Sequence, residues 1–385
     1  MNNTIAQNQI VKRALFDKIL TQLSQNTREI IFILGARQVG KTTLLKQLQT
    51  KLKNATYINC ERWEIQTSLK EYSISNIKKV FGNFRYILLD EVQYLPNMGR
   101  VLKIVHDELP EYRVIATGSS SLDIFKKGFE PLTGRKVVYY LYPLWIGEIK
   151  HEINEQTLND ILTYGLYPKV YFANHTKKRE HLEEITQSYL LKDTVSLGLV
   201  SRPHIVKELL QLLAYQVGSE VSYNELANNL NIHITTVRRY IDILEKMFII
   251  FRLPAFSRNP RKEVVKSRKI YFWDIGIRNA IANDIVPFFE RENKGGIWEN
   301  FVIAERLKRN NYLDKHYNYY FWRTYDQEEI DFIEVGDGEI FAYEIKYNPD
   351  KSVKMPDDFL TTYPNSSFKI ISRHNYLRFT IGTQL

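Results

Sequence analysis

The chain has 385 residues, of which 25% are charged and 44% belong to the apolar set, and its formal net charge is +9. This length allows two or three domains, each able to bury its own core, and the composition is typical of ordinary soluble globular protein. The one cysteine, Cys60, excludes an internal disulfide framework and a thiolate-rich metal site. No apolar run approaches the roughly 18 residues of a membrane span, and the N-terminal segment MNNTIAQNQIVKR lacks the apolar core of a signal peptide. We therefore expect a cytoplasmic protein with no membrane partner, and the positive charge suggests a polyanionic one.

The first motif is G-x-x-x-x-G-K-T, at residues 35–42, between the apolar run IIFIL and the helix-like segment TLLKQLQTKL. Strand, loop and helix in this order predict a phosphate-binding loop, whose N–H groups and helix N-terminus bind phosphate. Lys41 would contact the β- and γ-phosphates, and the Thr42 hydroxyl would bind Mg²⁺. Arg37 either touches phosphate or faces solvent. The sequence thus predicts binding of ATP and Mg²⁺ by Gly35, Ala36, Arg37, Gln38, Val39, Gly40, Lys41, Thr42 and Thr43.

A second apolar run, RYILL, ends in Asp90 and Glu91. A buried parallel strand with carboxylates at its C-terminal end is typical of a nucleotide site, where Asp90 would hold Mg²⁺ through water and Glu91 would orient the attacking water. The alternative is a strand that runs into an acidic turn. A third run, RVIAT, predicts an extra strand between these two, after which either Thr117 or Ser119 would read the γ-phosphate, although Ser and Gly are also common turn formers.

Arg135 follows a turn, LTG, and precedes the strand-like run KVVYYLYPL. An arginine beyond the third strand could stabilise the transition state in a neighbouring subunit, which implies a homo-oligomer with an arginine supplied in trans. The alternative is a solvated surface side chain.

The middle of the chain predicts a helical lid or connector over residues 151–216 and a winged helix-turn-helix over residues 217–285. Ser222 and Glu225 form a capping box, a tight turn follows at residues 231–234, and a second helix begins at Thr235. Residues 256–269 then hold six Lys or Arg and one Glu, which suits phosphate contacts. The expected DNA contacts are Thr236, Arg238, Arg239, Arg258, Arg261 and Lys262. Alternatively, this region packs against the ATPase and its arginines are solvated.

Residues 286–385 carry a third set of polar residues. Glu299 lies on a predicted helix, Asp331 precedes a Gly-Asp-Gly hairpin turn, and Glu344 and Lys346 lie on the same face of the next strand. These are the parts of a PD-(D/E)xK nuclease site, with Mg²⁺ bound by Glu299, Asp331 and Glu344, and Lys346 activating or orienting water.

Together these motifs resemble a family of bacterial and archaeal AAA-type ATPases, whose C-terminal half is a domain of unknown function that looks like a restriction-endonuclease fold. Further support comes from residues 36–39, 90–93, 132–135, 143–144, 270–276 and 299–302. Trp145 stands where the family pattern leads us to expect a serine, and no chemical role is proposed for this position. The resemblance implies an α/β chain: a P-loop NTPase domain with a central parallel sheet at residues 1–150, a winged-helix region, and a restriction-endonuclease-like domain.

Three functions are consistent with these predictions. The first is a DNA-associated ATPase whose hydrolysis controls a metal-dependent nuclease. The second is an ATP-switched binding or regulatory protein whose nuclease-like domain is a docking platform without catalysis. The third is a signalling ATPase that recognises a protein partner through the winged helix.

Overall fold

The structure is a computed structural model that describes residues 11–25, 27–119, 132–187, 200, 202–257, 268–292, 294–324, 328–350 and 353–382. It divides into two compact units. Unit 1 comprises Met1–Pro143 and Lys246–Phe248, and unit 2 comprises Leu144–Glu245 and Ile249–Leu385. In the described ranges, no helix has both the length and the apolar character that crossing a membrane requires.

Unit 1 is built on a five-stranded sheet in the order β2-β3-β4-β1-β5, in which all neighbours are parallel. Its strands are β1 (Ile30–Leu34), β2 (Ala55–Asn59), β3 (Tyr86–Asp90), β4 (Arg113–Gly118) and β5 (Lys136–Tyr140). Since β4 lies between β1 and β3, the prediction of an extra strand between the two nucleotide motifs is confirmed. The carboxyl ends of the strands share one edge of the sheet, where the loops that follow β1 and β3 meet.

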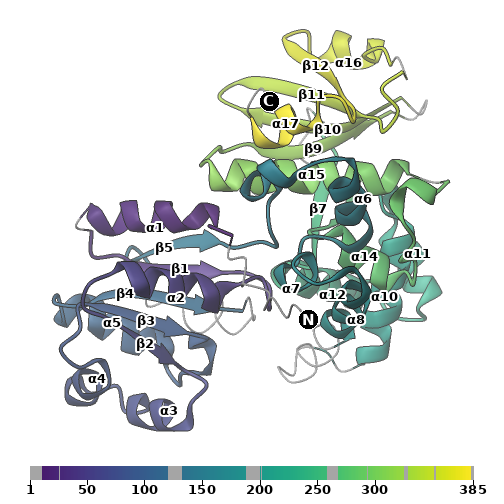
Figure 1. The fold of residues 1–385 in the computed structure, drawn as a ribbon. Coiled ribbons are helices and arrows are strands. Elements are labelled where there is room, and N and C mark those ends of the chain that lie inside the picture. The colour runs from purple at the N-terminus through teal and green to yellow at the C-terminus, as the bar shows by residue number, and fades with distance from the viewer. Residues whose placement is uncertain are drawn as a thin grey trace, which may run out of the picture. The chain divides into compact units, whose positions relative to one another are not determined.

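Helices surround this sheet (Figure 1). They are α1 (Ala14–Ser24), α2 (Lys41–Lys51), α3 (Trp63–Leu69), α4 (Ile74–Phe81) and α5 (Met98–Glu108), with a 3₁₀ turn η1 (Val92–Tyr94). Every residue of β1 is buried, as expected of a parallel strand covered on both faces. The uninterrupted run IIFIL therefore lies within the core of unit 1, and it holds the phosphate loop at a fixed end.

The helical part of unit 2 covers much of the region predicted as a lid or connector. Its elements are η4 (Ile146–Glu148), η5 (Lys150–Glu152), α6 (Glu155–Tyr164), α7 (Pro168–Tyr171), α8 (His175–Gln187), α10 (Pro203–Tyr215), α14 (Ile275–Ile281) and η7 (Phe288–Glu290). Asp274 caps α14, because its Oδ1 accepts from the Ile277 N–H at 3.0 Å, and its Oδ2 accepts from the Leu166 N–H at 2.6 Å. A Cβ on Gly276 would lie 2.0 Å from the Tyr164 carbonyl oxygen, so α14 packs directly on the end of α6.

Two helices lie in the chain between the first and second strands of a three-stranded antiparallel sheet in the order β6-β8-β7. The elements are β6 (Glu220–Val221), α11 (Tyr223–Asn229), α12 (Ile234–Lys246), β7 (Ile250–Pro254) and β8 (Arg268–Phe272). Ser222 caps α11 as predicted, with its Oγ 3.3 Å from the Glu225 N–H. The second helix begins at Ile234, one residue before the predicted start.

The rest of unit 2 is a four-stranded sheet in the order β12-β11-β10-β9 with three helices. The elements are α15 (Gly295–Tyr312), β9 (Asn318–Arg323), β10 (Glu329–Gly336), β11 (Glu339–Ile345), α16 (Asp357–Thr362), β12 (Ser366–Ile371) and α17 (Tyr376–Ile381). The predicted hairpin is present between β10 and β11, and its turn residues Asp337 and Gly338 have φ of 54° and 80°. Helix α15 lies between this sheet and helices α6 and α14, which explains why it is buried on nearly all sides (Figure 1).

Candidate functional site

The phosphate loop connects β1 to α2 at the carboxyl edge of the unit 1 sheet. A Cβ on Gly35 would lie 2.1 Å from the Leu141 carbonyl oxygen, and Gly40 has a φ of 99°, so both positions require glycine. Lys41 is only 4% exposed, and its Nζ donates to the carbonyl oxygens of Gly35 at 3.1 Å and Ala36 at 2.8 Å. The amine thus lies against the loop, 4.0 Å from Glu91 Oε1.

Asp90 is the buried acceptor at this edge. Its Oδ2 accepts from the Thr42 hydroxyl at 2.6 Å and from the Tyr57 hydroxyl at 2.7 Å, while its Oδ1 accepts from the Thr117 hydroxyl. The sequence did not single out Tyr57, which lies on β2, the strand next to β3. Burial and the hydrogen bond to Asp90 raise the pKa of Tyr57, so the phenol stays a proton donor. Cys60 is fully buried as expected, its N–H donates to the Asp90 carbonyl at 2.9 Å, and burial raises the pKa of its thiol.

Glu91 follows in the left-handed conformation with a φ of 56°. Its N–H donates to the Thr117 hydroxyl at 3.1 Å, and its Oε2 accepts from the Gln93 amide. The same amide donates to Ser119 Oγ at 3.0 Å. Both candidate γ-phosphate sensors therefore lie at this edge: Thr117 bonds Asp90 directly, and Ser119 reaches Glu91 through Gln93.

One arginine lies within the loop and a second contacts the loop from outside, and the sequence pointed only to the first. Arg37 donates to the Tyr94 hydroxyl at 3.2 Å. Arg13, just before α1, is 5% exposed and donates to the carbonyl oxygens of Val39 at 2.6 Å and Tyr142 at 2.7 Å. No local pattern marks Arg13, because its partners are 26 and 129 residues away.

Arg135 lies at the opposite edge of the sheet. Its carbonyl accepts from the N–H of Ile30, the first residue of β1, whereas the phosphate loop follows the last. Its Nε donates to Asp107 Oδ1 at 2.8 Å, and this bond, together with one to His106, lowers the pKa of Asp107 to about 2. Arg135 therefore cannot reach the phosphate loop of its own chain, and action in a neighbouring chain remains a prediction.

The residues at the carboxyl edge fit a magnesium-bound triphosphate. The glycine positions keep the loop free of side-chain bulk where Cβ atoms would clash, and Lys41 supplies a cationic group. The Thr42 hydroxyl and the Asp90 carboxylate are the hard oxygen ligands that Mg²⁺ prefers.

A second group of acidic residues lies in unit 2. We call it the acidic cluster, and it consists of Glu299 on α15, Glu329 and Asp331 on β10, and Glu344 on β11. Lys346 Nζ lies 2.6 Å from Glu344 Oε1 and 3.4 Å from Asp331 Oδ2, so the predicted Asp331, Glu344 and Lys346 are brought together. Burial, and secondarily Asp331, raises the pKa of Glu299 to about 7.

Lys269 on β8 was not predicted to take part in this site. Its Nζ lies 2.5 Å from Glu329 Oε1, 3.0 Å from Glu299 Oε1 and 3.8 Å from Asp331 Oδ1. Among the residues that the structure describes, no group of three or more His, Cys, Asp and Glu side chains is arranged to hold a metal ion. The donor set of Glu299, Asp331 and Glu344 therefore does not fit Mg²⁺ as it stands, because an ammonium group already lies among these carboxylates.

The expected DNA contacts are described only in part. On α12, Arg238 and Arg239 are exposed and Thr236 is half-buried, while Val237, Tyr240 and Ile241 are buried on the other face. The remaining three, Arg258, Arg261 and Lys262, lie outside the described residues.

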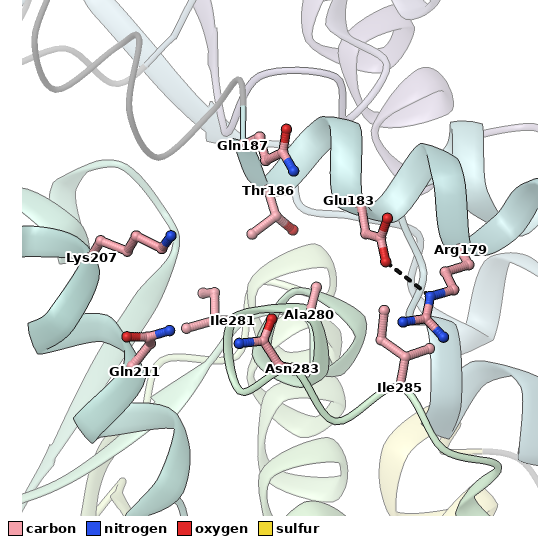
Figure 2. A pocket seen from close by; sticks show the side chains of 10 residues that line it. All are labelled: Arg179, Glu183, Thr186, Gln187, Lys207, Gln211, Ala280, Ile281, Asn283 and Ile285. Carbon is pink, nitrogen blue, oxygen red and sulfur yellow. Dashed lines mark hydrogen bonds and ion pairs between the residues drawn. The ribbon is translucent and has the colours of Figure 1, made fainter. Parts of the chain in front are cut away.

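A cavity of about 310 Å³ is formed between helices α8, α10 and α14 of unit 2. Figure 2 shows Arg179 and Glu183 of α8 turned toward each other, and their Nε and Oε1 are 2.9 Å apart. None of the predicted site residues lines this cavity.

Three family models match the chain. Residues 27–150 match an AAA domain, and residues 155–285 and 294–382 match two domains of unknown function, DUF8612 and DUF4143. Residues 27–150 thus form an AAA-type P-loop ATPase domain.

Similar whole proteins are known from several organisms. An uncharacterized protein of Haemophilus influenzae is 25% identical over 94% of this chain and 93% of its own length. A second, from Mycobacterium tuberculosis, is 26% identical over 84% of this chain and 71% of its own length. Among solved structures, the Walker-type ATPase PABY2304 of Pyrococcus abyssi is 16% identical with a TM-score of 0.48, covering 71% of this chain and 97% of that one.

Proposed function

We propose that this chain binds ATP with Mg²⁺ at the carboxyl edge of the unit 1 sheet and hydrolyses it. The observation that carries the proposal is the convergence of five residues on one edge: direct hydrogen bonds connect Thr42, Asp90, Thr117 and Glu91, and the Lys41 amine lies 4.0 Å from the Glu91 carboxylate. A phosphate loop with an acidic strand end beside it is the arrangement that phosphoryl transfer requires.

Each residue has a distinct role in this proposal. Lys41 exchanges its bonds to the loop carbonyls for phosphate oxygens, and Thr42 and Asp90 hold Mg²⁺, which neutralises developing phosphate charge when bound. Glu91 orients the attacking water, while Thr117 fixes Asp90 and the Glu91 backbone relative to each other.

The test is phosphate release with full-length protein and its variants. Glu91→Gln should lower hydrolysis by about 100-fold while ATP still binds, because it removes only the group that acts on water. Lys41→Ala should lose ATP binding, and Lys51→Ala, an exposed lysine on the same helix, should behave like the unchanged protein. Full hydrolysis by Glu91→Gln would contradict the assigned role.

We further propose that unit 2 associates with DNA through a winged helix. Two helices across a tight turn, preceded by β6 and followed by β7 and β8 of one antiparallel sheet in the order β6-β8-β7, support this assignment. The second helix presents Arg238 and Arg239 on its exposed face, which suits contacts with phosphates.

For the C-terminal sheet, two roles were predicted: a Mg²⁺-dependent nuclease and a docking platform without catalysis. The position of Lys269 within the acidic cluster favours the docking platform. Incubation of plasmid DNA with the protein and Mg²⁺ distinguishes the two. Nicking that is lost in Asp331→Ala and Lys346→Ala but kept in Lys41→Ala would support the nuclease.

A further inference from the structure

The acidic cluster encloses a lysine that belongs to a different sheet. Lys269 lies on β8 of the three-stranded sheet and is 1% exposed, whereas Glu299 comes from α15, and Glu329 and Asp331 come from β10 of the four-stranded sheet. Burying an ammonium group is costly unless carboxylates pair with it. Burial of this ammonium group therefore requires the carboxylates, and the close approach of the carboxylates to one another requires the ammonium group.

Neighbouring residues fix the position of Glu299, one of the carboxylates that contact the ammonium group. Tyr271, two residues further along β8, donates its hydroxyl to Glu299 Oε1 at 2.5 Å, the same oxygen that Lys269 contacts. On the far side, a Cβ on Gly218 would lie 3.3 Å from Glu299 Oε2, so the backbone at residue 218 closes over this carboxylate. A compact ammonium group with three donors can contact several carboxylates at once, as a metal ion does.

A second lysine, Lys346, pairs with the other carboxylate oxygen of Asp331. The Asp331 Oδ2 accepts from Lys346 Nζ at 3.4 Å and from the Ile345 N–H at 2.8 Å, while its Oδ1 faces Lys269. Glu344 is held by Lys346 at 2.6 Å. An additional divalent cation on these oxygens would be repelled by two ammonium groups a few ångströms away.

We propose that Lys269 is an internal cation that takes the place of a metal ion among Glu299, Glu329 and Asp331 and thereby fastens the three-stranded sheet to the four-stranded sheet. Removal of its ammonium group turns these three carboxylates into a divalent-cation site. The inference deepens the proposed docking role of the C-terminal sheet, and it is independent of ATP hydrolysis.

The test counts bound Mn²⁺ by electron paramagnetic resonance in nucleotide-free, full-length protein that also carries Lys41→Ala. With Lys269 present, Asp331→Asn should leave the Mn²⁺ isotherm unchanged. Lys269→Met should gain one bound Mn²⁺, which Lys269→Met combined with Asp331→Asn should lose again. Mn²⁺ should raise the Tm of Lys269→Met and leave that of the parent protein unchanged.

Lys346→Met is the matched control, because it removes the other lysine and keeps Lys269, so it should gain no ion. The proposal is overturned if Asp331→Asn lowers Mn²⁺ binding when Lys269 is present, or if folded Lys269→Met gains no ion. Should Lys269→Met fail to fold, the Asp331→Asn comparison alone decides: equal isotherms support the internal cation, and a lost ion refutes it. ATP hydrolysis is read separately by phosphate release, so either proposal can fail alone.

Discussion

Asp90 accepts hydrogen bonds from three hydroxyl groups, those of Thr42, Tyr57 and Thr117. Thr42 would bind Mg²⁺ through an oxygen lone pair and could keep its hydrogen on Asp90, because a hydroxyl has one donor hydrogen and two acceptor lone pairs. Tyr57 and Thr117 have no proposed contact with the metal and hold the carboxylate itself. A hydrogen bond to a charged group contributes about 1.5–3 kcal/mol, so these two hydroxyls matter for the position of the metal ligand.

Tyr57→Phe removes one of these hydroxyls and keeps the ring. We expect hydrolysis to fall about 10-fold and the Mg²⁺ concentration for half-maximal rate to rise, because one charged hydrogen bond of about 1.5 kcal/mol is lost. Phosphate release measured against Mg²⁺ at saturating ATP checks this. Tyr86→Phe is the control, because Tyr86 begins β3 at the other edge of the sheet. Unchanged Mg²⁺ dependence in Tyr57→Phe would show that Thr117 suffices.

Substitution of Arg135 tests whether a neighbouring chain takes part in hydrolysis. Since it lies at the edge opposite its own phosphate loop, a catalytic effect has to come from a neighbouring chain. Arg135→Ala should keep ATP binding and lose about 1,000-fold in hydrolysis, and the specific activity of the unchanged protein should rise with its concentration. Arg85→Ala, another arginine on that edge, should retain activity. Concentration-independent hydrolysis insensitive to Arg135→Ala would leave this residue as the partner of Asp107.

At the scale of elements, the sequence predicted what consecutive residues specify. The strand, loop and helix around Lys41 are contiguous, and so is the hairpin whose turn needs Asp337 and Gly338 with positive φ. The ionic role of Lys269 could not be predicted in this way, because the sequence shows it only as one of the basic residues at 256–269, and its carboxylate partners are 30 or more residues away on other elements. Only the pairing of whole elements brings them together.

The start of α14 depends on one buried carboxylate. Asp274 accepts from the N–H groups of Ile277 and Leu166, and an asparagine in its place has a single acceptor oxygen. We expect Asp274→Asn to lower the free energy of unfolding by about 1–3 kcal/mol, the cost of one unsatisfied buried N–H. Urea denaturation measures this. Asp160→Asn, which removes a partly exposed pair with Lys178, should cost about 1 kcal/mol or less. Equal losses would argue against the capping role.

Helix α12 carries the test of DNA association. Replacing both Arg238 and Arg239 by Glu should weaken binding to duplex DNA and flatten its dependence on salt, because fewer phosphates are neutralised. Fluorescence anisotropy at several salt concentrations measures both effects. Lys177→Glu, an exposed change on α8, is the control. If DNA affinity and its salt slope stay the same, the exposed face of α12 does not contact phosphate, and a protein partner becomes the better explanation.

At the scale of the whole molecule, the chain consists of two compact units, and the nucleotide site belongs to unit 1 alone. A ligand that binds only the folded form stabilises it by about 2.7 kcal/mol at a concentration 100 times its Kd. Hydrogen exchange should therefore slow in β1, β3 and β4 when MgATP is added, and stay unchanged in β9–β11. In Lys41→Ala, added MgATP should not slow exchange in β1, β3 or β4. Equal protection of both units would mean that they open together.

Local sequence patterns could predict only part of the strand order. The sequence predicted three strands around the nucleotide motifs and the insertion of one between the other two, which the order β2-β3-β4-β1-β5 confirms. It did not place β2 beside β3, and so it missed Tyr57 as a partner of Asp90. A contact between neighbouring parallel strands depends on their register, which no single strand encodes.

Cys60 lies under Asp90 with no exposed surface, and it is the sole cysteine in the chain. The native protein should therefore react slowly with maleimides, and a cysteine introduced at the surface can be labelled selectively without removing Cys60. Conversely, the rate at which Cys60 reacts with a disulfide reagent measures how often the sheet opens transiently. MgATP bound at the carboxyl edge of the same sheet should lower this reaction rate, because it stabilises the closed form.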